Sequence, residues 1–317
     1  MDKTSIVIAS LASAAVVSSA AVIFVFSGRV PKTLPTPAVR GGESIRVVES
    51  GHDVVRRPFV RPAVDASAAV NVICGFDSRS AESYPMRIGA LRSIANRSDL
   101  PAEEVDMLLG YIASTNDAMR ADRVAGLKNE VLNLLRSQNP VPSELAPLLI
   151  DMIGSNDYDA TIIDYCIQHL GSMWTDFENE GMRENVRKVF VSVASRKDVP
   201  YAGTALYALA DEEGSPEEYR RKLRRLAVDL ACDSEANRLA RITAIQVAGN
   251  HGYTEVLPSA RNTLSEPHPD TVLAMVSVGT IGSLGAPSDV ELLERFRGSA
   301  GVRLQPAIDA AIGKLRQ

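Results

Sequence analysis

The sequence is poor in the residue types that build most catalytic and metal sites. It has 3 cysteines, 4 histidines and 1 tryptophan in 317 residues, and aromatic residues make up only 5%. Cys74, Cys166 and Cys232 lie far apart. Their odd number, without C-x-x-C spacing, excludes a disulfide framework and a cysteine-based zinc site. With so few aromatics, aliphatic residues must build the core, which suits closely packed helices.

Familiar catalytic signatures are missing too. The chain has no phosphate-binding glycine loop, no G-x-S-x-G and no H-E-x-x-H. We therefore predict that the protein is not an enzyme. We expect neither a cofactor nor a metal, and no small-molecule substrate is evident.

Two polar groupings are compatible with a metal site or a nucleophile, but each lacks an essential part. Asp157, Asp159 and Asp164 lack the glycine and the final glutamate of a calcium loop, so we predict that these acids lie at a helix start. Cys166 and His169 have i, i+3 spacing but no third, orienting group. We interpret them as a buried cysteine beside a histidine at the edge of an apolar face.

An excess of positive charge is also lacking. The net charge is -5, whereas proteins that neutralise nucleic-acid phosphates usually have a basic surface. This balance argues against a nucleic-acid partner. Residues 220–225 form the strongest basic cluster. They predict either a solvated helix face or a surface for acidic protein, phosphate groups or anionic lipid.

Residues 5–26 carry no charge and end in Ala-Ala-Val-Ile-Phe-Val-Phe. About 20 apolar residues in a helix span the hydrocarbon of a bilayer, so we predict a transmembrane anchor within residues 1–27. A cleaved signal peptide is the alternative, because residues 18–20 resemble a cleavage site. The apolar run continues beyond them, which favours the anchor.

The orientation of this single-pass protein is open. Lys3 precedes the anchor, whereas Arg29, Lys32 and Arg40 follow it. The positive-inside rule then places the C-terminal part in the cytoplasm. An anchor so near the N-terminus commonly acts as a start-transfer signal instead, and on that ground we favour an extracytoplasmic C-terminal part.

Residues 28–69 are interrupted by prolines, and we predict a disordered linker there. Residues 70–317 show the apolar spacing of amphipathic helices and no strand-like alternation. Helix pairs are expected to begin near Tyr84, Ala118, Asp159, Pro200, Glu235 and Pro269, with a terminal helix from Val302. This spacing, roughly 33 to 42 residues, is near that of helical repeats.

A short pattern recurs in the C-terminal part. Its first copy runs from Arg238 through Ala240 and Ala244 to Ala248-Gly249-Asn250, and glycine steps recur at Ile281-Gly282 and Ile312-Gly313. We interpret each unit as a small-residue helix, a glycine turn and a second amphipathic helix. The pattern resembles HEAT repeats in their short form. The resemblance is clear from residue 235 onward and looser over residues 84–234, and Thr271 replaces the arginine in the next unit.

The resemblance implies an all-α, right-handed α-solenoid of stacked HEAT-like helix pairs. It also implies that the second helix of each pair lines the concave surface. We expect these helices near residues 183, 216, 255 and 287, with arginines at their outward positions: Arg187, Arg221, Arg224, Arg225, Arg261 and Arg295. We predict that this basic ridge binds an acidic protein partner.

HEAT-like proteins are mostly binding scaffolds, although a few bacterial relatives are chromophore lyases or DNA glycosylases. We therefore expect a membrane-tethered protein-interaction scaffold. One alternative is a HEAT-fold enzyme, or a module that binds nucleic acid or anions through a basic concave face. A structural spacer in the cell envelope is the other.

The anchor gives the first testable prediction. The full-length protein should stay in the membrane fraction after carbonate extraction and should need detergent for release, because residues 5–26 span the bilayer. Recovery of the intact N-terminus in the soluble fraction would contradict the anchor. A mature N-terminus near Ala21 would favour a signal peptide.

Overall fold

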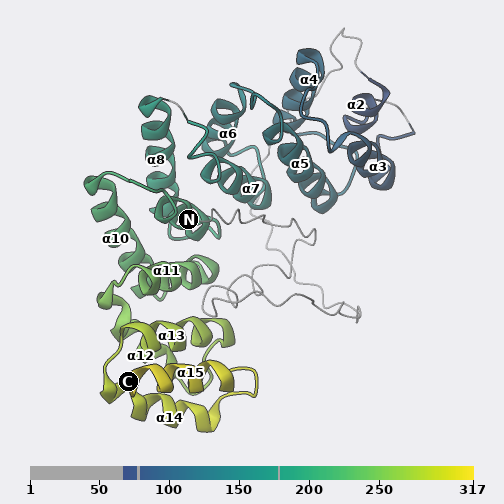
Figure 1. Cartoon of the computed structure of the whole chain (residues 1–317). Coiled ribbons are helices and arrows are strands. Elements are labelled where there is room, and N and C mark those ends of the chain that lie inside the picture. The colour runs from purple at the N-terminus through teal and green to yellow at the C-terminus, as the bar shows by residue number, and fades with distance from the viewer. Residues whose placement is uncertain (1–66, 77–78, 178) are drawn as a thin grey trace. The chain divides into compact units, whose positions relative to one another are not determined.

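A computed structural model describes residues 67–76, 79–177 and 179–317 (Figure 1). These residues form fourteen α-helices and two short 3-10 helices, with no strand among them. The predicted all-α class is therefore confirmed for the described residues. The anchor expected at residues 5–26 and almost all of the linker expected at 28–69 lie outside them. None of the described helices is long and apolar enough to cross a membrane.

The helices pack in neighbouring pairs along the chain. The pairs are α2 (Ala68–Ile73) with α3 (Tyr84–Ile94), α4 (Ala102–Ala113) with α5 (Ala121–Arg136), α6 (Leu145–Gly154) with α7 (Ala160–Gly171), α8 (Glu180–Ala194) with α9 (Ala202–Ala210), α10 (Glu217–Cys232) with α11 (Arg238–Asn250), α12 (Leu257–Ser265) with α13 (Thr271–Leu284), and α14 (Val290–Ser299) with α15 (Gln305–Leu315). Four of these pairs, those that begin at α6, α10, α12 and α14, are joined by loops of only five residues.

The pairing expected from the sequence is wrong by one helix. Helices do start close to Tyr84, Pro200, Glu235 and Pro269, but each of them is the second member of its pair. The helix expected from Val302 is α15, the partner of α14. Apolar periodicity locates a helix but does not say which of its two chain neighbours it packs against more closely.

The pairs place their helices in two rows. The odd row is α3, α5, α7, α9, α11, α13 and α15, and each of its helices contacts the next. The even row is α2, α4, α6, α8, α10, α12 and α14, whose successive helices contact one another less extensively. Two 3-10 helices belong to this row: η1 (Thr254–Val256) precedes α12, and η2 (Pro287–Asp289) precedes α14. The helix α10 reaches the following pair through η1.

Small residues explain the close contacts of the odd row. A Cβ added at Gly282 of α13 would lie 2.6 Å from the Cβ of Ala311 in α15, and one added at Gly249 of α11 would lie 2.8 Å from Thr280 Oγ1 in α13. Gly171 and Gly203 are equally tight against Ala208 and Thr243. The interpretation of Gly249 and Gly282 as turn glycines is therefore wrong. They lie inside helices and let two helix backbones come close together.

Aliphatic side chains fill the space between the rows, as the composition predicts. In the last two pairs the core includes Leu264, Val278, Ile281, Leu293 and Ile308, all buried. The helix α13 is apolar on nearly all sides because it packs against α11, α12 and α15. Most residues of α13 therefore face a neighbouring helix, and only Thr271 and Ser283 near its ends are exposed.

Two matched glycine substitutions test the close contacts of the odd row. Gly282→Ala should lower the free energy of unfolding by about 1–3 kcal/mol, because the added methyl overlaps the backbone and side chain of Ala311. Gly313→Ala adds the same methyl to α15, where nothing lies within 4 Å, and should raise the free energy of unfolding by about 0.5–1 kcal/mol. Chemical denaturation of both variants measures the difference. Equal effects would mean that α13 and α15 are not in close contact.

Candidate functional site

All six arginines of the predicted basic ridge lie on the even row, on α8, α10, α12 and α14. They do not form one free surface. Arg187, Arg224 and Arg261 each bind a carboxylate that lies ahead of the next even-row helix. The predicted outward position of Arg187 is wrong, because this side chain is buried. Whether any of these arginines contacts a partner stays a prediction.

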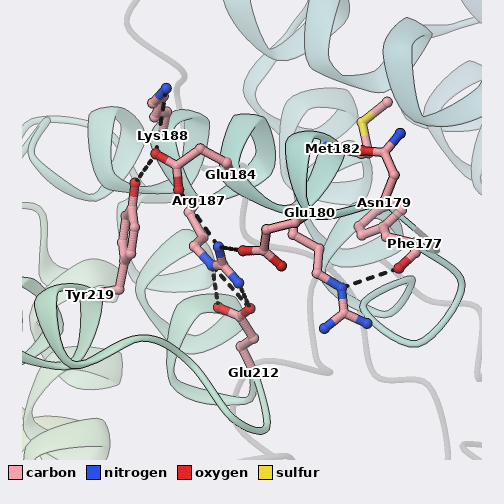
Figure 2. Close-up of polar contacts among 10 residues, drawn as sticks. Phe177, Asn179, Glu180, Met182, Glu184, Arg187, Lys188, Glu212 and Tyr219 are labelled. Carbon is pink, nitrogen blue, oxygen red and sulfur yellow. Dashed lines mark hydrogen bonds and ion pairs between the residues drawn. The ribbon is translucent and has the colours of Figure 1, made fainter.

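Arg187 lies at the centre of a network of carboxylates (Figure 2). Its Nε lies 3.0 Å from both carboxylate oxygens of Glu212, and its Nη2 donates to Glu212 Oε1 at 2.6 Å. Its Nη1 also donates to Glu180 in the first turn of α8. These hydrogen bonds, above all those to Glu212, raise the pKa of Arg187. The buried Arg187–Glu212 pair therefore ties α8 to the loop that precedes α10.

A second part of this network joins the same two helices. The Tyr219 hydroxyl on α10 donates to Glu184 of α8 at 2.8 Å, and the Arg187 guanidinium lies 5.4 Å from the centre of the Tyr219 ring (Figure 2). Burial, followed by the hydrogen bond to Glu184, raises the pKa of Tyr219 to about 12. Tyr219 is therefore a neutral donor at physiological pH. The network therefore holds α8 and α10 together, and its side chains donate and accept hydrogen bonds among themselves.

The same contact recurs at the next two steps of the even row. Arg224 Nε donates to Glu255 of η1 at 2.8 Å, and Arg261 binds Asp289 of η2 through Nε and Nη2 at 2.7 and 2.9 Å. Arg187, Arg224 and Arg261 are spaced 37 residues apart. The hydrogen bond from Arg261 holds the pKa of Asp289 below its usual value. The repeated residues thus connect one helix pair to the next.

The odd row uses arginines in the same way at two of its steps. Arg238 of α11 donates to both oxygens of Asp270, the N-cap of α13, at 2.7 and 2.9 Å. Arg87 of α3 donates to both oxygens of Asp117, in the loop before α5. Arg238 is the residue with which the recurring pattern of the sequence begins. In this structure Arg238 and Arg87 both link a helix to the loop ahead of the next helix in its row.

Three predicted arginines remain at the surface. Arg221 and Arg225, one turn apart on α10, are exposed and have no ion pair within the described part of the chain. Arg295 on α14 is also exposed and lies 3.5 Å from Glu291 of its own helix. Lys188, 37 residues before Arg225, is exposed on α8 and pairs with Glu184 at 3.4 Å. The unpaired positive charge of the predicted ridge is therefore confined to α10.

A buried polar group in the N-terminal pairs has no counterpart in the sequence-based prediction. Tyr111 and Asp117 surround the guanidinium of Arg87, which lies 4.9 Å from the Tyr111 ring centre. Beside them, Lys128 donates to the main-chain oxygens of Ile112 and Ser114 at the end of α4. Burial lowers the pKa of Lys128 to about 8. The one sequence feature that indicates this group is that Arg87 and Lys128 lie within the apolar stretches of predicted helices.

The two weaker candidates resolve into structural roles. The Asp159 side chain accepts hydrogen bonds from the N–H groups of Thr161 and Ile162, as the predicted helix start requires. The prediction is wrong for Asp164, which lies inside α7 and accepts hydrogen bonds from Thr204 and Gln168. Cys166 is buried as predicted, and burial raises the pKa of its thiol to about 12. His169 is buried too, not at an edge, and burial lowers its pKa to about 3. At neutral pH this pair is a thiol and an uncharged imidazole, not a thiolate and an imidazolium.

No cluster of histidine, cysteine and acidic side chains suited to a metal ion is found among the described residues. Comparison with known proteins adds no assignment, since neither a protein-family model nor a curated protein matches the chain.

Replacement of Arg187 tests the role of the buried pair. Arg187→Met should lower the free energy of unfolding by about 3–5 kcal/mol, because it leaves the carboxylate of Glu212 buried without a counter-ion. Arg295→Met removes the same charge from an exposed position and should change it by less than about 0.5 kcal/mol. Urea denaturation monitored by circular dichroism compares the two. Similar stability of both variants would show that Arg187 does not tie α8 to the following loop.

Proposed function

We propose that the protein is a membrane-tethered interaction scaffold of HEAT-like helix pairs and that α10 binds an acidic protein segment. The observation that carries the binding site is the pair of exposed arginines, Arg221 and Arg225. They lack an ion pair in the described chain, whereas the ridge arginines around them are bound to carboxylates. Arginine binds carboxylates through paired donors, and one helical turn suits two neighbouring acidic side chains.

The scaffold part of the proposal is supported by the packing of the pairs. Each row is built from contacts between successive members, which is how repeat proteins assemble their cores. Helices on the inside of a curved stack are closer together than those on the outside. The close contacts of the odd row therefore support an inner position for it, and the second helix of every pair lies in that row. This matches the HEAT-like arrangement once the pairing is corrected.

An inner odd row leaves the predicted arginines on the other side of the stack. They lie on the first helices of the pairs, in the even row, and so we assign α10 to the outer surface rather than to a concave one. Binding of an acidic segment there needs only exposure and unpaired positive charge, and Arg221 and Arg225 have both. The tether in the proposal rests on residues 5–26 of the sequence.

Charge reversal on α10 tests this site. Arg221→Glu with Arg225→Glu should weaken binding of a fluorescent decaglutamate peptide about tenfold, because two exposed attractions become repulsions. Fluorescence anisotropy at several salt concentrations measures this, and binding to the wild type should weaken as salt rises.

The matched control reverses two exposed cations of the last pair, Arg303→Glu with Lys314→Glu, which also have no ion pair in the described chain. It should keep at least half of the wild-type affinity. An equal loss in both double variants would mean that net charge alone attracts the peptide. No binding to the wild type would favour a structural spacer.

A further inference from the structure

The three ion pairs of the even row differ greatly in their exposure to water. The side chains of Arg187 and Glu212 are 3% and 1% exposed, whereas those of Arg224 and Glu255 are 54% and 43% exposed. Arg261 and Asp289 lie between these extremes. Water and salt screen an exposed pair far more than a buried one. Of these three steps, the one between α10 and η1 therefore has the most easily broken ion pair.

A few other contacts also hold the even row together at that step. The helix α10 meets the following pair mainly through η1, which has only three residues, and through a 3.1 Å hydrogen bond that Ser259 of α12 donates to the main-chain oxygen of Ala231. Arg224 also lies 5.5 Å from the centre of the Tyr253 ring, just ahead of η1. At the far end of α10, the Cys232 thiol lies 3.9 Å from the main-chain oxygen of Glu255. The odd row stays continuous here because α9 packs against α11, so η1 can separate from α10 without breaking that row.

Arg224 is next to Arg225 and three residues from Arg221, the two arginines of the proposed site. A segment whose carboxylates bind Arg221 and Arg225 therefore brings negative charge beside Arg224. There it competes with Glu255 for the Arg224 guanidinium, whose hydrogen bonds cannot all serve both. Binding on α10 and the contact between α10 and η1 thus share one side chain.

We propose that the Arg224–Glu255 ion pair is a latch that an acidic partner opens, so that binding on α10 releases η1 from this helix. The proposal rests on the proposed function, since it assigns the regulation of the same site. Thermodynamic reciprocity gives a direct consequence: whatever breaks the latch must strengthen binding of the acidic segment. Glu255→Gln, which removes the competing charge and keeps the shape, should tighten decaglutamate binding about threefold.

The chain contains its own reporter of the latch. Cys232 is exposed and its thiol contacts Glu255, whereas Cys74 and Cys166 are buried. Burial raises the pKa of both buried thiols to about 12, so they alkylate slowly unless the helices unfold. Desolvation also raises the pKa of the Cys232 thiol, and opening of the latch relieves it. Alkylation of Cys232 therefore measures opening, and the other two cysteines monitor unfolding in the same sample.

The experiment follows N-ethylmaleimide alkylation of the three cysteines of the full-length protein in detergent by mass spectrometry. Saturating decaglutamate should raise the Cys232 rate at least about threefold and leave Cys74 and Cys166 unchanged. Glu255→Gln should show the higher rate without peptide, and peptide should add nothing further. Arg295→Met, which removes an arginine outside this step, should behave as the wild type does.

The outcomes separate the latch from the site. If decaglutamate binds but the Cys232 rate does not change, the latch is overturned and the proposed function stands. An unchanged rate in Glu255→Gln also overturns the latch. If decaglutamate does not bind although Glu255→Gln raises the rate, the ion pair holds η1 as described, but both the acidic-partner function and its control of the latch are overturned.

Discussion

Each connection in the even row from α8 to α14 depends on an arginine that reaches forward to a carboxylate ahead of the next helix. Arg187, Arg224 and Arg261 make this contact with Glu212, Glu255 and Asp289. Because the acid sits in a loop or a 3-10 turn, the ion pair fixes where the next helix begins and on which side it lies. Arg238 and Asp270 do the same in the odd row. One type of contact thus links neighbouring pairs in both rows.

Successive helices are connected mainly by close packing in the odd row and largely by ion pairs in the even row. This difference decides which arginines remain unpaired and can bind a partner. In the odd row, glycines such as Gly249 and Gly282 let helix backbones touch, so close packing connects successive helices and ion pairs only add to it at two steps. In the even row, successive helices touch less, and ion pairs bridge the remaining distance. Three of the six ridge arginines, Arg187, Arg224 and Arg261, make these bridges. Arg221 and Arg225, next to Arg224 on α10, have no ion pair in the described chain and stay open to water.

The sequence predicts local features of this protein and misses those that depend on distant partners. Apolar periodicity locates the helices, and Asp159 caps α7 as its position suggests. Three features could not be predicted: which helices pair with one another, the packing role of Gly282 and the burial of Arg187. The partner of Arg187 lies 25 residues along the chain and that of Arg238 lies 32, and a single sequence contains no measure of such contacts. The regular spacing of the arginines, together with acidic residues just ahead of several helices, was the only feature of the sequence that could have indicated these ion pairs.

The 37-residue spacing of Arg187, Arg224 and Arg261 has a consequence for how such a chain changes length in evolution. Duplication or loss of a 37-residue segment keeps each arginine together with its forward carboxylate. The helix pairs that become neighbours can then form the same ion pair. An insertion between an arginine and its forward carboxylate, by contrast, lengthens the chain that connects the two. Growth by whole units is therefore tolerated, and the unit boundary can fall anywhere along a helix rather than only in a loop.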